Sequence, residues 1–302
     1  MLVLKGHRGR VRSLSFSADG GLLASAAGHG KAVSLWELTG RGKRSFLSGH
    51  PGDVTAVAFA PTGSFLASMD SWGQVQLWNT AERRKSAKLA RPFQGVFGMA
   101  FTADGRTLAV GRRVVSFATL QYVVEHLDRN GKKLPDWKVP SGAYAGVFCG
   151  RSLACSPAGN ALAVVGNGPD VHLWGLSPVR LRARLPQRES VNALAFSPDG
   201  RTLAVAAGLE VRLWGAATGA ERATLKGHTR MVTSVAFTPD GRLLASAGTD
   251  GQVKLWDVAA AAERAAFDWQ VGPVTALALA PDGMRGACGG LEGDLAIWDL
   301  DL

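Results

Sequence analysis

Three pieces of one stretch decide the fold: Val-Ala-Phe-Thr-Pro-Asp-Gly at residues 235–241, Leu-Leu-Ala-Ser at 243–246 and Val-Lys-Leu-Trp-Asp at 253–257. Their apolar parts are short, rich in Val, Leu, Phe and Ala, and bounded by turn residues, which is typical of β-strands. Pro-Asp-Gly favours a tight turn, because proline fixes φ and glycine tolerates positive φ. The stretch therefore predicts two strands joined by a turn, followed by a third strand that ends at tryptophan.

The same pattern recurs along the 302 residues. Its turn glycines are Gly20, Gly63, Gly105, Gly159, Gly200, Gly241 and Gly283. Successive spacings are 43, 42, 54, 41, 41 and 42 residues. The tryptophans that end the third strands are Trp36, Trp78, Trp174, Trp214, Trp256 and Trp298. In the third copy we place Leu127 in this slot, and we assign the long step to insertions at 111–119 and 139–149. A repeat length of roughly forty residues with several short strands predicts an all-β propeller.

The predicted strands do not alternate polar with apolar residues, as a sheet with one wet face would. Small residues such as Ala58 and Ala236 stand between large ones such as Val57 and Phe59. This pattern predicts sheets that are buried on both faces, as when blades stack face to face.

The repeats resemble those of the WD40 repeat family, whose signature is Gly-His near the start and Trp-Asp at the end. The pairs present are Gly6-His7, Gly49-His50, Gly227-His228, Trp256-Asp257 and Trp298-Asp299, with Trp36-Glu37 and Trp78-Asn79 as near matches. The resemblance covers residues 1–302 and implies one domain, a seven-bladed β-propeller of four-stranded antiparallel blades. In this family the N-terminal strand, here residues 1–4, completes the last blade and closes the ring.

The resemblance also implies a buried hydrogen-bond relay in each well-formed repeat. Repeat 6 has all of its members, which are His228, Ser246, Asp250 and Trp256. Repeats 1 and 2 keep the His, Ser and Trp but carry His29 and Trp72 where Asp250 stands in repeat 6. Repeats 3, 4, 5 and 7 lack Gly-His. We therefore expect the complete relay only in repeat 6, and more dependence on apolar packing elsewhere.

Several function classes are disfavoured by the sequence. It has no apolar run long enough for a membrane span, no HExxH motif and no Cys/His cluster. The glycine-rich stretch 286–290 lacks the Lys and Ser/Thr of a phosphate loop, and we interpret it as turns. The three cysteines, Cys149, Cys155 and Cys288, have no CxxC spacing, which is typical of reduced thiols. We therefore expect a cytoplasmic, monomeric protein that is not an enzyme and holds no cofactor or metal.

Two surfaces remain as candidate binding sites. The first is one face of the ring around the central channel, where the family geometry gathers arginine and aromatic residues, the types enriched in binding hot spots. Its candidates are Arg8, Arg10, His29, Trp72, Phe93, Arg112, Arg113, Phe117, Tyr144, Arg188, Arg230 and Trp269. We expect a protein or peptide partner there, of acidic character, and in particular we expect Arg8, Arg10 and His29 to lie beside Trp72.

The second surface is a belt of positive charge that follows the third strands of repeats 1 to 4. Its members are Arg41, Lys43, Arg44, Arg83, Arg84, Lys85, Lys88, Arg129, Lys132, Lys133, Arg180, Arg182 and Arg184. The formal charge of the chain is +10, so a polyanion such as nucleic acid is the alternative partner. The belt has no aromatic residues for base stacking, which favours a merely solubilising role.

Overall fold

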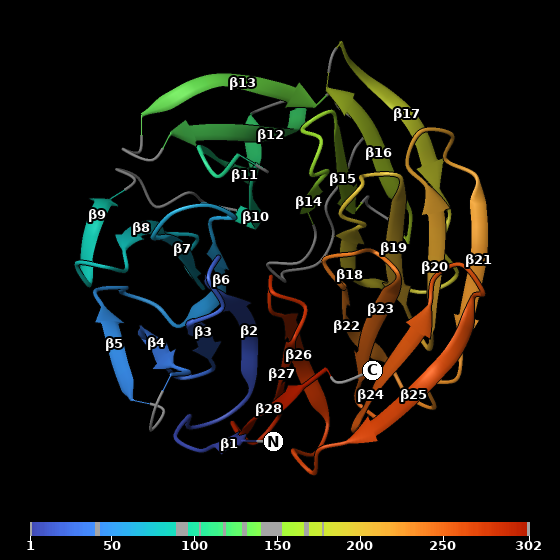
Figure 1. Ribbon diagram of the computed structural model, residues 1–302. Coiled ribbons are helices and arrows are strands. Elements are labelled where there is room, and N and C mark those ends of the chain that lie inside the picture. Colours follow the sequence, from blue (N-terminus) through green and yellow to red (C-terminus); the bar gives the residue numbers. More distant parts are fainter. Residues whose placement is uncertain are drawn as a thin grey trace.

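The computed structural model describes residues 2–39, 43–88, 96–102, 104–116, 119–128, 132–139, 153–165, 169–176 and 178–300. All regular structure in these residues is β, in seven four-stranded antiparallel sheets that form the blades of a ring (Figure 1). Nowhere in this described part is there a helix of the length and apolarity needed to span a bilayer. The fold expected from the repeats is confirmed.

The strands of each blade follow one another from the centre of the ring outward. Blades 1 to 3 comprise β2 (Val11–Phe16), β3 (Leu22–Ala27), β4 (Ala32–Glu37) and β5 (Arg44–Ser48); β6 (Val54–Phe59), β7 (Phe65–Asp70), β8 (Val75–Asn79) and β9 (Arg84–Lys88); β10 (Val96–Phe101), β11 (Thr107–Ser116), β12 (Thr119–Asp128) and β13 (Lys133–Val139). Blades 4 to 6 comprise β14 (Leu153–Cys155), β15 (Ala161–Val165), β16 (Val171–Leu176) and β17 (Val179–Leu185); β18 (Val191–Phe196), β19 (Thr202–Ala207), β20 (Glu210–Gly215) and β21 (Glu221–Lys226); β22 (Val232–Phe237), β23 (Leu243–Gly248), β24 (Gln252–Asp257) and β25 (Ala262–Asp268).

Blade 7 is built from both ends of the chain. It comprises β26 (Val274–Leu279), β27 (Arg285–Gly290) and β28 (Leu295–Asp299), and its fourth strand is β1 (Leu2–Leu4). β1 pairs antiparallel with β28, with Leu2 opposite Ile297 and Leu4 opposite Leu295. Thr275 Oγ1 then donates to the carbonyl oxygen of Val11 at 2.6 Å, which links blade 7 to blade 1. The ring is therefore closed by the strand expected from the sequence.

The turns after the inner strands owe their shape to side chains. In blade 6, Thr238 Oγ1 donates to Asp240 Oδ1 at 2.6 Å and accepts from the Leu243 amide at 3.0 Å, while Gly241 adopts a φ of 70°. The same hydroxyl-to-carboxylate bond joins Ser17 to Asp19, Thr102 to Asp104 and Ser197 to Asp199. These hydroxyls lower the pKa of the four aspartates.

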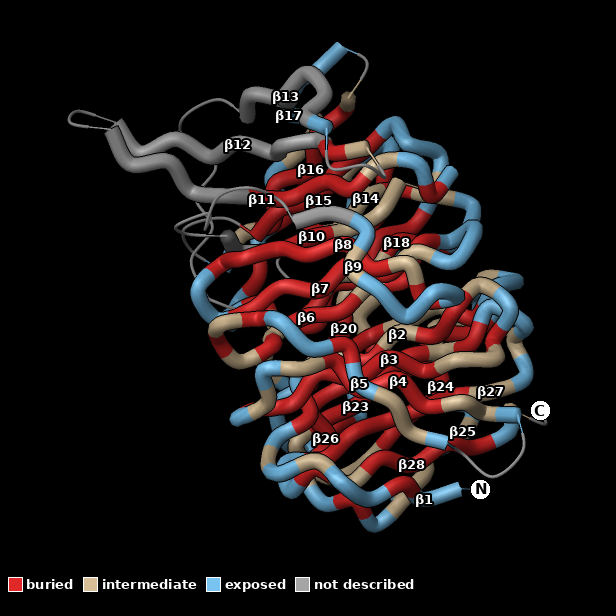
Figure 2. Tube along the Cα trace, turned by 90° about the vertical axis from the view of Figure 1, so that its left-hand side faces the viewer, coloured by how far each residue is buried: buried red, intermediate tan, exposed pale blue. Residues whose placement is uncertain are grey.

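The second strands of the blades are buried on both faces of the sheet. All six residues of β19 and of β23 are buried, and Figure 2 shows buried strands running through the disc beneath exposed loops. Leu127 lies opposite Leu108, as Trp256 lies opposite Leu244, so the alignment of repeat 3 is confirmed. Two-sided burial therefore explains why the strands lack alternation.

Two local expectations are corrected or refined. The residues 286–290 that we interpreted as turns lie in strand β27. A Cβ at Gly289 would come 2.5 Å from Val11 Cγ1, so this glycine permits close packing of blade 7 against blade 1. The insertion at 111–119 lengthens both β11 and β12 to ten residues and extends the hairpin to the pair Ser116–Thr119. Most of the insertion at 139–149 lies outside the described residues.

Candidate functional site

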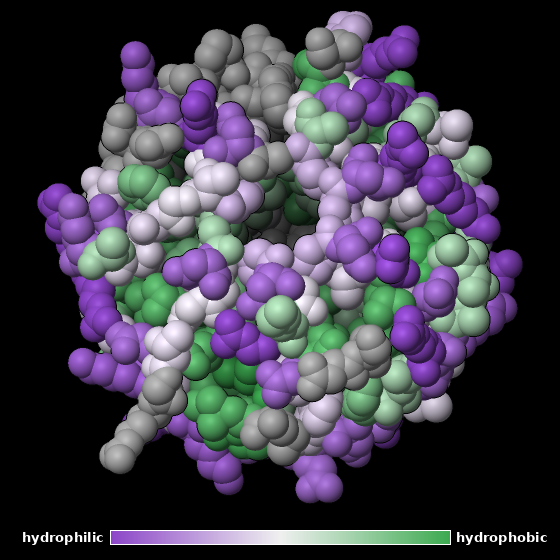
Figure 3. Space-filling view, in the orientation of Figure 1, coloured by the Kyte–Doolittle hydropathy of each residue, from purple (hydrophilic) through white to green (hydrophobic). Residues whose placement is uncertain are grey.

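The two faces of the ring carry different loops. In every antiparallel blade the inner strand begins where the second strand ends, so the links before the inner strands and those between the second and third strands share one face, here called the loop face. Both chain ends lie on the opposite face, here called the chain-end face (Figure 2). Figure 3 views the chain-end face, with hydrophilic side chains around most of its rim and a hollow at the ring's centre.

A relay of side chains holds the loop face of blade 6. Trp256 Nε1 donates to Ser246 Oγ at 2.8 Å, and His228 lies 2.7 Å from Ser246 Oγ through Nε2 and 2.9 Å from Asp250 Oδ2 through Nδ1. Burial lowers the pKa of His228, although the Asp250 carboxylate opposes this shift. Because a carboxylate only accepts, the neutral ring carries its proton on Nδ1 and accepts the Ser246 hydroxyl at Nε2.

Blade 2 also has a complete relay, contrary to the expectation that only repeat 6 has one. Its acid is Asp70, the last residue of β7, whose Oδ2 lies 3.2 Å from His50 Nδ1. Asp70 occupies the position of Gly248 in blade 6, where a Cβ would lie 2.8 Å from His228 Nδ1. The acid has therefore moved two residues along the chain, and Trp72 does not displace it.

Blade 1 ends its relay in a cation. Trp36 Nε1 donates to Ser25 Oγ at 2.8 Å and His7 Nε2 lies 2.7 Å from the same oxygen, but Arg44 Nη2 stands 3.4 Å from His7 Nδ1. A guanidinium only donates, so His7 accepts at Nδ1 and keeps its proton on Nε2, the reverse of His228. Arg44 also donates to the Gly6 carbonyl at 2.7 Å and lies over the Trp36 ring at 4.5 Å.

This arrangement predicts that mild acid destabilises the protein. Burial and the Arg44 charge lower the pKa of His7 to about 4. In the unfolded chain this ring takes up a proton near the ordinary histidine pKa of 6.5, whereas in the folded protein it does so only near 4. The free energy of unfolding therefore falls as the pH drops through this window. We expect His7 to contribute a loss on the order of 1–3 kcal/mol.

Urea unfolding of wild type and His7→Gln at pH 7, 6, 5 and 4.5 measures this contribution. The variant is expected to show a shallower fall in unfolding free energy with acid, whatever its stability at pH 7. Equal slopes for the two proteins would contradict a buried, neutral His7.

The other blades bury their tryptophans without this relay. In repeats 4 and 5, Val164 and Val205 replace the serine, and Trp174 Nε1 and Trp214 Nε1 are buried without a hydrogen-bond partner among the described residues. In blade 7, Trp298 stacks on Trp269 with ring centroids 5.1 Å apart. Apolar and aromatic contacts therefore replace polar ones in these three blades.

Trp72 is the most exposed aromatic ring on the described part of the loop face, at 63%. Asp70 Oδ1 holds its loop by accepting from the amides of Trp72 at 3.0 Å and Gln74 at 2.8 Å. The ring lies beside Gly52, where a Cβ would come 3.2 Å from Trp72 Cδ1. The backbone beneath Trp72 is thus fixed while most of its side chain faces solvent.

The remaining candidates of the loop face fall into three groups. Exposed on its loops are Arg8, Arg10, His29, Arg188 and Arg230. Trp269 is instead half-buried, because it stacks between Phe267 and Trp298. Phe93, Phe117 and Tyr144 lie outside the described residues, and Arg112 and Arg113 lie in β11 with side chains that are not described.

Sequence reasoning missed three apolar side chains on this face. Leu209 is 51% exposed in the β19–β20 turn, Met231 is 48% exposed before β22, and Leu291 is 43% exposed after β27. Leucine and methionine are usually assigned to the core when a repeat is read from sequence, so these three side chains were not recognised as exposed. Their position at a loop tip, and not their residue type, is the signal that distinguishes them.

Several residues of the basic belt form contacts within the protein. Arg83 pairs with Glu37 of blade 1, Arg84 with Glu82, and Arg182 donates to the Asn160 carbonyl at 2.9 Å. Arg44 is the relay residue described above, and Lys85 lies 5.5 Å from the Trp78 ring centroid. Arg41 and Arg129 lie outside the described residues, and the side chains of Lys88 and Lys133 are not described. Lys43, Lys132, Arg180 and Arg184 are exposed.

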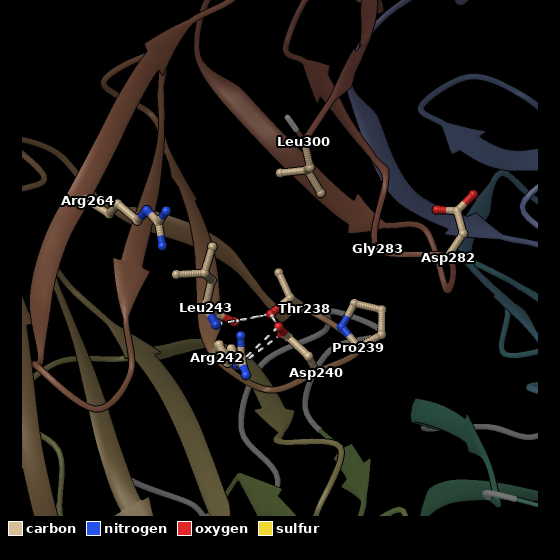
Figure 4. Close-up of a pocket in the computed structure, with 9 residues that line it drawn as sticks. All are labelled: Thr238, Pro239, Asp240, Arg242, Leu243, Arg264, Asp282, Gly283 and Leu300. Atoms are coloured by element: carbon tan, nitrogen blue, oxygen red, sulfur yellow. Dashed lines mark hydrogen bonds and ion pairs between the residues drawn. The ribbon is translucent and has the colours of Figure 1, made fainter. Parts of the chain in front are cut away.

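Two cavities lined by described residues lie on the chain-end face. One of about 440 Å³ lies between the turns of blades 6 and 7, where Asp240 is bonded to Thr238 and Arg242, and Leu300 covers one side (Figure 4). Another of about 510 Å³ is lined by Asn160, Arg180, Leu181, Arg182 and Ala217. Within the described ranges, no group of three or more His, Cys, Asp or Glu side chains is placed to hold a metal ion.

Comparison with known families agrees with this geometry. The family model described as "WD domain, G-beta repeat" matches residues 1–37, 42–79, 181–215 and 219–257, which are repeats 1, 2, 5 and 6. Among curated proteins, none matches the chain. Repeats 3, 4 and 7, which the family model does not match, form four-stranded blades of the same topology.

Proposed function

The chain belongs to the WD40 repeat family, whose propellers generally act as scaffolds for protein interactions, and from this premise we propose that it is a non-catalytic platform that binds a protein or peptide through its loop face. The observation that carries the proposal is the set of exposed apolar side chains on that face: Trp72, Leu209, Met231 and Leu291. Exposure of large apolar side chains to water at loop tips is unfavourable unless a partner covers them.

The rigidity of the loops supports the same proposal. The amide of Val54 donates to the Gly30 carbonyl, and that of Val232 to the Gly208 carbonyl, each at 2.8 Å, so loops of neighbouring blades are tied together. A binding surface that is already ordered loses little conformational entropy on association. We further propose that the partner is acidic and that the propeller is a cytoplasmic monomer. Free Cys155 and Cys288, whose pKa burial raises to about 12, support a reducing compartment.

Capture of partners from the native host by immobilised protein tests this function. Met231→Asp and Leu209→Asp are expected to lower the recovered partner at least tenfold, because a charge at a buried interface core is costly. Met284→Asp is the matched control, since Met284 is 69% exposed in the β26–β27 turn of the chain-end face. Unchanged melting curves would show that all three variants fold. Loss of the partner with Met284→Asp alone would contradict the proposal.

A further inference from the structure

A group of four cations lies on two loops of blade 1, on the same face of the ring as Trp72. Lys5, Arg8 and Arg10 precede β2, and Lys31 precedes β4. All four side chains are exposed, and none has an ion pair within the described part of the chain. His29 shares the second of these loops, with a φ of 64° and its ring near Gly9. The two loops themselves carry no Asp or Glu. On the loops that adjoin them, Asp53 and Asp294 are half-buried and Glu292 is exposed, so the exposed cations outnumber the exposed carboxylates.

Backbone hydrogen bonds connect these loops to Trp72 in three steps. The Gly28 amide donates to the Arg10 carbonyl at 2.8 Å, and the Val54 amide donates to the Gly30 carbonyl at 2.8 Å. The Ser71 amide then donates to the Asp53 carbonyl at 2.8 Å, directly before Trp72. The loops that carry the cations and the loop that carries Trp72 are thus joined in series by backbone hydrogen bonds from blade 1 to blade 2. That Arg8, Arg10 and His29 lie directly beside Trp72 stays a prediction.

Trp72 stands at this position without a role in the turn. In blade 6 the tip residue Asp250 must bond His228, the Thr229 amide and the Gln252 amide. In blade 2, Asp70 makes the equivalent bonds from the end of β7, including one to the Gly52 amide at 3.2 Å. Because Asp70 supplies the carboxylate of the relay from the end of β7, the tip of the β7–β8 turn does not need an acid. Trp72 can therefore stand there without a role in the fold.

We infer that this surface binds an extended acidic polypeptide segment, with one apolar side chain against Trp72 and its carboxylates over Lys5, Arg8, Arg10 and Lys31; the inference rests on the proposed function. Charge complementarity selects the occupant. The four cations are distributed over two loops, at positions 5, 8, 10 and 31, which suits a run of Asp or Glu better than a single phosphate. A lone exposed ring offers no stacking platform for successive bases, which disfavours a nucleic acid.

Fluorescence anisotropy with defined probes tests the inference. The first probe is a labelled peptide of one Phe followed by six Glu, and the second replaces each Glu by Gln. A peptide of one Phe and one phosphoserine and a dT12 oligonucleotide are the remaining probes. The intact protein is expected to bind the Glu peptide at least tenfold more tightly than each of the others.

Variants then locate the binding. Trp72→Ala and the double variant Arg8→Glu/Arg10→Glu are each expected to raise the Kd for the Glu peptide at least tenfold. Lys43→Glu/Arg180→Glu changes the net charge equally on exposed belt residues, and it is expected to change the Kd less than twofold. Thermal melting establishes that each variant is folded.

Four results would overturn the inference: no binding of the Glu peptide, equal binding of the Gln peptide, preference for the phosphopeptide or oligonucleotide, or equal losses from both charge reversals. If the host partner is still captured through Met231 and Leu209 in any of these cases, the acidic-segment inference fails and the platform function stands. Loss of both would remove the proposed function as well.

Discussion

A chain that lacks residues 1–5 is expected to melt roughly 6–12 °C below the intact protein and to aggregate on heating. The deletion removes β1, so β28 loses its partners for the pairs Leu2–Ile297, Val3–Ala296 and Leu4–Leu295. It also removes Leu4, which is 9% exposed and packs in the cluster between blades 7 and 1. Lost apolar burial and unpaired backbone groups together cost at least about 3 kcal/mol.

Point variants separate the two contributions to closure. Val3→Thr changes a side chain that is 41% exposed and keeps the backbone pairing, so its melting temperature should stay close to that of wild type. Leu4→Ala keeps the backbone but loses buried area, and is expected to fall between Val3→Thr and the deletion. A deletion that melts like wild type would show that β1 does not hold the ring closed.

Replacement of Asp70 by Ala is expected to be among the most destabilising single changes, at about 3 kcal/mol or more. Asp70 is 2% exposed and accepts from His50 Nδ1 and from the amides of Gly52, Trp72 and Gln74. Alanine would leave these donors without their acceptor in a region closed to water.

Comparison with blade 6 makes this expectation quantitative. Asp250→Ala should cost about 1–3 kcal/mol, less than Asp70→Ala, because the Asp250 side chain is 6% exposed whereas that of Asp70 is fully buried, and Asp250 accepts from fewer amides. Glu210→Ala is the control, since the half-buried Glu210 side chain forms only long ion pairs of 3.5 Å, with Arg212 and Lys226, within the described part of the chain. The three free energies come from urea unfolding at pH 7. A cost for Asp70→Ala equal to that of Glu210→Ala would contradict the blade 2 relay.

The sequence predicted the fold well because the deciding features are local and repeated. Pro-Asp-Gly turns, strands without alternation and a recurring tryptophan each have a short-range physical cause, and seven copies make their register unambiguous. Leu127 could be aligned with the tryptophans of the other repeats because Gly105 and the flanking strands define the register of repeat 3.

Details that depend on packing between blades could not be predicted in this way. The alignment looked for the acid of repeat 2 at position 72, yet a carboxylate two residues earlier reaches the same histidine because the strand end approaches it. Residues 286–290 have turn composition, but their glycines serve close contact with Val11 and Val271. Trp269 was assigned to the loop face because of the loop on which it lies, but its ring stacks on Phe267 and Trp298.

Site-specific photo-crosslinking tests the central claim, that the loop face is the binding surface, most directly. A benzophenone amino acid is placed at Leu209, Met231 or Met284 in turn, and the protein is irradiated in its native host. All three side chains are well exposed, at 51%, 48% and 69%, so accessibility does not bias the comparison. The account predicts adducts of the same mass from positions 209 and 231 and none from 284. Adducts from position 284 with none from 209 or 231 would place the binding surface on the chain-end face and contradict the account.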